Sequence, residues 1–153
     1  GFMFDTRAKK DIDLLAISIH TSLDNVNMRV VVYTRSGTHV QNEYSISGWT
    51  LVCDTFVMGQ GFMKRTSIPE NAFSPVHVKG GETQAFYVSL SSQSVWYSKP
   101  DDEVLLNDVY ISNNDLEVKV GTGIDAFPLS NSEQSHFKPC IFNGILTYAE
   151  SFS

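Results

Sequence analysis

The sequence predicts an all-β fold, an antiparallel two-sheet sandwich of jelly-roll-like type with about ten strands. Apolar and polar residues alternate over short segments from Phe2 to Phe152, which is the two-residue period of a strand. Each segment ends at Gly, Asn, Asp, Ser or Pro, the residues that favour turns. No stretch of useful length shows the helical period, so helices do not enter the predicted architecture.

The first part of the chain carries clear strand patterns separated by polar breaks. They are Phe2–Ala8, Ile12–Thr21, Met28–Arg35 and Trp49–Met58. The third is a β-branched run that stops at Ser36-Gly37, and the fourth stops at Gly59-Gln60-Gly61. Between them, Thr38–Ser47 is irregular or forms a short strand.

The second part begins with Phe62–Pro75, whose two prolines predict a loop across an edge or end of the sandwich. Asn113-Asn114-Asp115 predicts a hairpin tip and Gly121–Gln134 a loop, and Asn143-Gly144 predicts a bulge inside the last strand. The strand patterns in this part are Val76–Lys79, Thr83–Leu90, Val95–Ser98, Asp108–Ser112, Leu116–Val120 and Cys140–Tyr148.

The alternation also predicts which side chains form the core, because every second residue of a strand points to the same face. Trp49 follows a glycine and starts a strong strand, so we place it in the core as well. The other expected core residues are Ile17, Ile19, Val30, Val32, Leu51, Phe86, Val88, Leu90, Val118 and Leu146.

Length and charge narrow the class of protein. A chain of 153 residues suits one sandwich domain over 1–153. Its start at Gly1-Phe2 without Met suggests a processed chain or an excised module, and we expect one module of a larger parent chain. The net charge of −6 and the scattered basic residues argue against nucleic acid as a partner. No apolar run approaches the roughly 20 residues of a membrane span, so we expect no membrane insertion.

The two cysteines, Cys53 and Cys140, lie beside strong strand patterns. Two buried free thiols and one long-range disulfide both fit this placement. We predict the disulfide, or a distance short enough for one to form.

Catalytic and metal motifs are missing from the sequence. The four histidines show no metal-ligand spacing, and no Gly-x-Ser-x-Gly occurs, so no enzyme activity is predicted. Oxygen-rich turns at Asp101-Asp102-Glu103 and Asn113-Asn114-Asp115 could serve a structural Ca²⁺, but solvated turns are the favoured interpretation and we predict no cofactor and no metal. Further oxygen donors would be Asp5, Asp54, Asp108 and Asp125.

One pair of aromatic residues suggests a ligand. Trp96-Tyr97 forms a short strand between Ser-rich turns, with Lys99 and Asp101 nearby. Exposed rings beside polar groups can stack on a sugar face while the polar groups bind its hydroxyls. The competing interpretation is a half-buried aromatic rim.

Several short sequence segments, in this order along nearly the whole chain, resemble those of a known module. They are Gly1-Phe2-Met3-Phe4-Asp5, Tyr33-Thr34-Arg35-Ser36-Gly37, Gly48-Trp49-Thr50-Leu51-Val52, Thr83-Gln84-Ala85-Phe86-Tyr87-Val88, Ser112-Asn113-Asn114-Asp115-Leu116 with Gly121-Thr122-Gly123, and Phe142-Asn143-Gly144-Ile145-Leu146-Thr147-Tyr148. The chain resembles a β-sandwich module repeated in large secreted or surface proteins of marine bacteria and of diatoms and related algae. The resemblance implies an extracellular or cell-surface location and a multi-domain parent, and it brings no catalytic residues.

Taken together, these features predict a non-catalytic extracellular surface or matrix module that works by adhesion or self-assembly. The alternative is a carbohydrate-binding module that targets a polysaccharide. The expected partners are therefore a polysaccharide or other copies of the chain.

Overall fold

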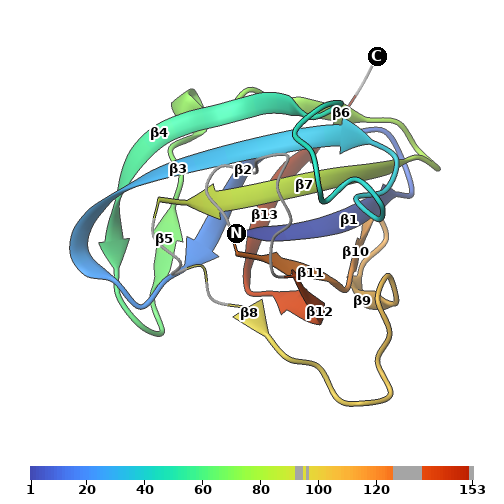
Figure 1. Ribbon diagram of the computed structural model, residues 1–153. Helices are drawn as coiled ribbons and strands as arrows, with labels where there is room; N and C mark the ends of the chain where they lie inside the picture. Colours follow the sequence, from blue (N-terminus) through green and yellow to red (C-terminus); the bar gives the residue numbers. More distant parts are fainter. Residues whose placement is uncertain (92–94, 96, 126–135, 152–153) are drawn as a thin grey trace.

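A computed structural model of the chain describes residues 1–91, 95, 97–125 and 136–151, and it shows two antiparallel sheets packed face to face (Figure 1). The predicted all-β two-sheet sandwich is confirmed. The larger sheet has nine strands, β4 (Thr50–Gln60), β3 (Asp24–Ser36), β7 (Thr83–Leu90), β1 (Phe2–Ala8), β11 (Gly121–Ile124), β12 (His136–Phe142) and β8 (Tyr97–Ser98) in that order, with β10 (Leu116–Lys119) and β9 (Val109–Ser112) branching from β1. The smaller sheet has four, β13 (Gly144–Glu150), β2 (Ile12–His20), β5 (Arg65–Ser67) and β6 (Val76–Val78).

The larger sheet divides at β1. Phe2 and Met3 pair with β11, whereas Thr6–Ala8 pair with β10. One branch therefore continues through β11, β12 and β8, and the other ends in the hairpin of β10 and β9. This division places the β9–β10 hairpin at one side of the sandwich (Figure 1).

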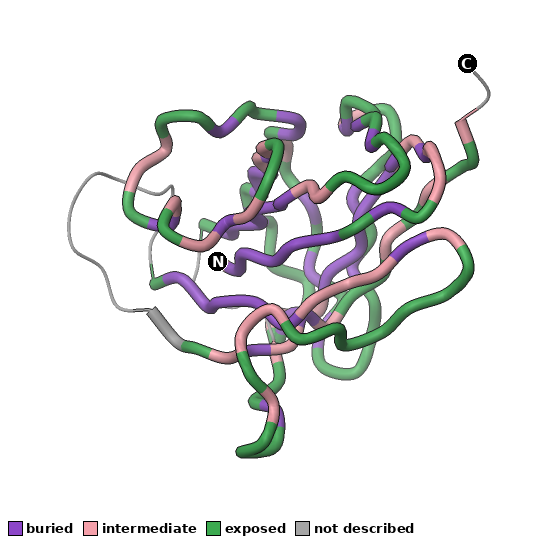
Figure 2. The backbone as a smooth tube through the Cα atoms, turned by 90° about the vertical axis from the view of Figure 1, so that its right-hand side faces the viewer, coloured by how far each residue is buried: buried purple, intermediate pink, exposed green. Residues whose placement is uncertain are grey.

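The core lies between the sheets, and the central strands are buried on both of their faces. Phe2 and Phe4 of β1 point into the main core, while Met3 belongs to a second apolar cluster on the outer face of the larger sheet. Figure 2 shows the buried residues concentrated in the middle of the molecule and the exposed ones on connecting segments. A strand that is covered on both faces has a nearly continuous apolar sequence, and β7 shows the same pattern.

Most predicted core residues are buried or pack against the core, but the prediction for Leu51 is wrong. Its side chain is 49% exposed. The ladder between β3 and β4 joins Val32 to Cys53 and Tyr33 to Leu51, which leaves Val52 as an extra residue. This bulge reverses the alternation, so Val52 turns inward and Leu51 outward.

The structure corrects three predicted segments. The predicted loop Phe62–Pro75 contains β5 and a 3-10 turn at Glu70–Ala72, and the predicted loop Gly121–Gln134 begins with β11, its part from 126 on lying outside the described residues. The predicted last strand Cys140–Tyr148 is two strands in different sheets. Asn143 is therefore the crossing point between the sheets rather than part of a bulge.

The predicted disulfide between Cys53 and Cys140 is wrong, because the two buried thiols are not bonded to each other. Cys53 lies on β4 and Cys140 on β12, which are five strand-to-strand steps apart in the sheet order. Neighbouring strands are about 4.8 Å apart, whereas the Cα atoms of a disulfide lie within about 7 Å of each other. The topology, which sequence spacing does not reveal, keeps the two thiols apart.

Candidate functional site

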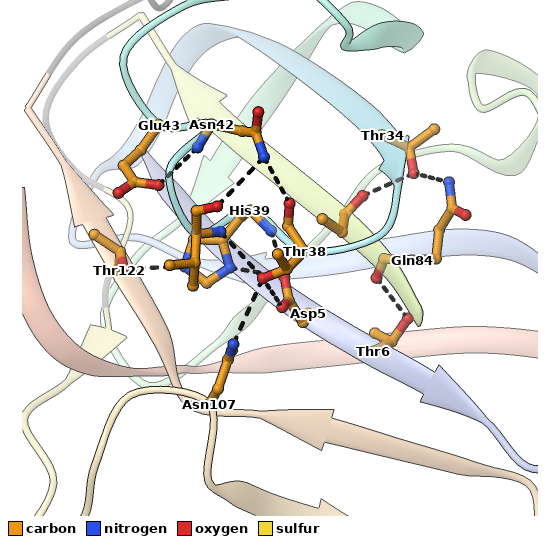
Figure 3. Close-up of polar contacts among 12 residues, drawn as sticks. Asp5, Thr6, Thr34, Thr38, His39, Asn42, Glu43, Gln84, Asn107 and Thr122 are labelled. Atoms are coloured by element: carbon orange, nitrogen blue, oxygen red, sulfur yellow. Dashed lines mark hydrogen bonds and ion pairs between the residues drawn. The ribbon is translucent and has the colours of Figure 1, made fainter. Parts of the chain in front are cut away.

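A buried polar cluster fastens the segment 37–49, here called the capping loop, to the outer face of the larger sheet (Figure 3). Asp5 on β1 accepts three hydrogen bonds from this loop. The donors are the Thr38 hydroxyl (2.5 Å), the His39 backbone N–H (2.9 Å) and His39 Nδ1 (2.7 Å). On the other side of the imidazole, Nε2 lies 3.0 Å from the hydroxyl of Thr122 on β11.

The electrostatics of this cluster favour the ionised form of Asp5. Burial is the largest single influence and by itself would raise the pKa of Asp5, but the hydrogen bond and the charge of His39 act against it. The hydrogen bonds from Thr38 and from the His39 backbone act in the same direction, so the pKa of Asp5 lies below its ordinary value. A buried carboxylate is tolerated because it is paired and hydrogen-bonded.

The order carboxylate, imidazole, hydroxyl resembles the relay that activates a nucleophile in hydrolases. However, Asp5, His39 and Thr122 are 1%, 0% and 0% exposed. A substrate cannot reach a hydroxyl that is fully covered, so the arrangement in this conformation is a structural anchor. No sequence motif pointed to it, because its members lie on three distant segments.

Further contacts hold the rest of the capping loop. Trp49 Nε1 donates to the carbonyl of Asn42 (3.0 Å), and the indole packs edge-on against Tyr87. Buried Glu43 lies 3.3 Å from the ammonium of Lys138. The predicted burial of Trp49 is confirmed, although it lies in the outer cluster rather than between the sheets.

The second candidate site is a cleft of about 770 Å³ between the β9–β10 hairpin and β13. This volume is within the range of ligand sites, about 300–1,000 Å³. The lining residues are His20, Thr21, Phe62, Met63, Ser98, Tyr110, Ile111, Ser112, Asn113, Leu116, Val118, Phe142, Asn143, Gly144, Ile145, Leu146 and Tyr148.

The chemistry of the cleft is apolar and uncharged. None of its described lining residues is Asp, Glu, Lys or Arg. Its amides are engaged, since Asn113 Nδ2 donates to the Tyr148 hydroxyl (2.8 Å) and Asn143 Nδ2 donates to the Ser98 hydroxyl (2.8 Å). The first of these bonds ties the hairpin tip to β13.

Three of the four residues predicted to bind carbohydrate lie in the described part of the chain. Trp96 lies outside the described residues. Tyr97 is half-buried on β8, its ring centroid lies 5.5 Å from that of Phe2, and burial raises its pKa. Lys99 and Asp101 are exposed in the following segment.

Three of the oxygen donors considered for Ca²⁺ are engaged in other contacts. Asp5 is held by the capping loop, Asp54 pairs with Arg29 (2.7 Å), and the Asp108 carboxylate accepts from the backbone N–H of Leu105 (2.9 Å). In the described part of the chain, no group of three or more His, Cys, Asp and Glu side chains is placed to hold a metal ion.

Among the described residues, no helix has the length and apolar character needed to cross a bilayer.

Fold and site together define a β-sandwich with an uncharged cleft at one open side. No protein-family model, curated protein or solved structure matches the chain.

Proposed function

We propose that the chain is a non-catalytic extracellular surface or matrix module that works by adhesion or self-assembly through the open side of the sandwich. The observation that carries the proposal is the exposure of β9. Val109, Tyr110 and Ile111 are 51%, 46% and 58% exposed, and in the described residues β9 pairs with β10 alone.

An edge strand of this kind is a ready partner for another chain. Its unpaired N–H and C=O groups can extend the sheet, and proteins that avoid such pairing place Lys, Pro or inward charges on their edges. The residues of β9 are Val, Tyr, Ile and Ser, none of which protects an edge in this way. The low content of charged residues, 18%, and the resemblance to surface modules support the extracellular setting.

Sedimentation velocity over a range of protein concentrations tests the proposal. We expect association that Ile111→Lys weakens, because the new charge would be buried in the contact. Leu51→Lys is the matched control, since Leu51 is similarly exposed but lies on β4, a different edge of the larger sheet, and does not line the cleft. A protein that stays monomeric to about 1 mM, and that binds no matrix polymer, would contradict the proposal.

Carbohydrate binding is the second candidate, and the aromatic rings Tyr110, Phe142 and Tyr148 in the cleft favour it. Rings of this kind can stack on sugar faces. The sequence prediction adds Trp96, Tyr97, Lys99 and Asp101 as a platform. A glycan array followed by calorimetry tests both, with Trp96→Ala expected to weaken binding about tenfold if the predicted platform is used and Tyr110→Ala if the cleft is used.

A further inference from the structure

The cleft occupies the place where the smaller sheet lacks a strand over β9. Ile111 pairs with Val118, and side chains of directly paired residues point to the same face of a sheet. Val118 packs against the main core, as does Leu116 two residues earlier. Ile111 therefore lies on the core-facing side of the larger sheet, yet it is more than half exposed. The larger sheet extends beyond the strands that cover it.

The smaller sheet ends at β13, on the same side of the molecule. In the described residues β13 pairs with β2 alone, from Gly144 opposite Ile19 to Glu150 opposite Ile12. Its residues Leu146 and Tyr148 pack against the core and line the cleft. A further strand about 4.8 Å from β13 would lie over β9 and cover Ile111.

We infer that this cleft receives one extended, uncharged peptide segment of another polypeptide, which adds to β13 as a fifth strand of the smaller sheet. This inference rests on the proposed function and names its partner. Backbone pairing with β13 would supply affinity, and apolar side chains at alternate positions of the segment would fill the cleft.

The chemistry of the lining selects the occupant. Because the described lining residues carry no carboxylate, ammonium or guanidinium group, and His20 is their one imidazole, little there compensates a charge on the inward side of the segment. The engaged amides of Asn113 and Asn143 offer few free donors to a ligand rich in hydroxyls. An apolar side chain, by contrast, removes the exposed surface of Ile111 and Tyr110 from water.

The larger sheet extends beyond the smaller sheet at β9, and this favours a free peptide segment over the edge strand of a second folded copy as the occupant of the cleft. If two copies paired through β13 about a twofold axis, the β9–β10 hairpin of each would meet the hairpin of the other below the new pair of strands. A single extended segment, such as a linker or a tail, brings no second sheet and fits without this collision.

The test uses the unmodified protein and a capped heptapeptide, acetyl-Thr-Val-Thr-Val-Thr-Val-Thr-amide, with binding followed by calorimetry and by backbone amide NMR. Two further peptides carry N-methyl groups, one on the valines and one on the threonines. Along a strand, successive N–H groups point to opposite neighbours, so we expect one methylated peptide to lose affinity about tenfold or more and the other to retain it. Equal affinity of both methylated peptides would overturn strand addition.

A variant and two competing ligands complete the experiment. Ile111→Lys should weaken peptide binding about tenfold or more, while Leu51→Lys should leave it unchanged. Binding of dodecanoate or of a glycan without binding of the peptide overturns the inference. If copies associate but the unmethylated peptide does not bind, the inference fails while the proposed assembly function stands. If neither occurs and the protein also binds no matrix polymer, both fail.

Discussion

Replacing Asp5 by alanine should destabilise the protein strongly, because the carboxylate fastens the capping loop. The change removes the acceptor of three hydrogen bonds, two from His39 and one from Thr38. It also leaves a fully buried imidazole without its charged partner. Breaking a buried pair in this way costs about 3–5 kcal/mol. At about 2–4 °C per kcal/mol for a chain of this size, the melting temperature should fall by about 6–20 °C.

Thermal unfolding followed by circular dichroism and by calorimetry at pH 7 measures this loss. Asp54→Ala is the matched control, because Asp54 also makes a short ion pair, with Arg29, but on the exposed surface. Exposed pairs contribute little to stability, so the control should melt close to the unmodified protein. Equal melting temperatures for the two variants would refute the role given to Asp5.

The pH dependence gives an independent check on the same residue. Burial opposes ionisation of Asp5, but its bonds with His39 and Thr38 place its pKa below the value in the unfolded chain. The resulting stabilisation is complete above the unfolded pKa and is lost as the pH falls through the folded pKa. Unmodified protein should therefore lose stability in acid more steeply than Asp5→Asn, and parallel curves would contradict the pKa assignment.

Three further outcomes are expected. Burial raises the pKa of Cys53 to about 11 and also raises the pKa of Cys140, so both thiols should resist alkylation at pH 8 in the native protein and both should react, without reductant, once it is denatured. Gly121→Ala should cost about 1–3 kcal/mol in urea unfolding, because its Cβ would overlap the carbonyl oxygen of Met3, and an unchanged midpoint would contradict that close approach. Trp49→Phe should release the bond to Asn42 and lower protection of the capping-loop amides in hydrogen exchange, with the core strands unaffected.

The strands that were predicted best are those with the strongest local pattern. Phe2–Ala8 and Thr83–Leu90 coincide with β1 and β7, because dense apolar runs bounded by turn residues leave little doubt about a strand. β11 was missed because Gly121-Thr122-Gly123 has the composition of a loop. Its backbone is extended because the neighbouring strands β1 and β12 pair with it, which is a tertiary effect.

The sites were harder to predict than the strands, for a physical reason. Asp5 and His39 come into contact only after the capping loop folds over β1, and neither residue type at its position predicts that contact. The cleft likewise depends on how far two sheets overlap, which alternation within a single strand does not encode. The disulfide prediction failed on the same point, since strand order decides the distance between Cys53 and Cys140.

The central position of β1 has a consequence for how the chain reaches its fold. Phe2 pairs with Val88 on one side and with Gly123 on the other. During synthesis, β1 is therefore made before the partners of Phe2, which follow about 85 and 120 residues later. Contacts so distant in sequence make folding slow, on the order of milliseconds to seconds for β-sandwiches. Until those partners are made, the apolar face of β1 is exposed to water, and an exposed apolar strand is the kind of surface that chaperones bind.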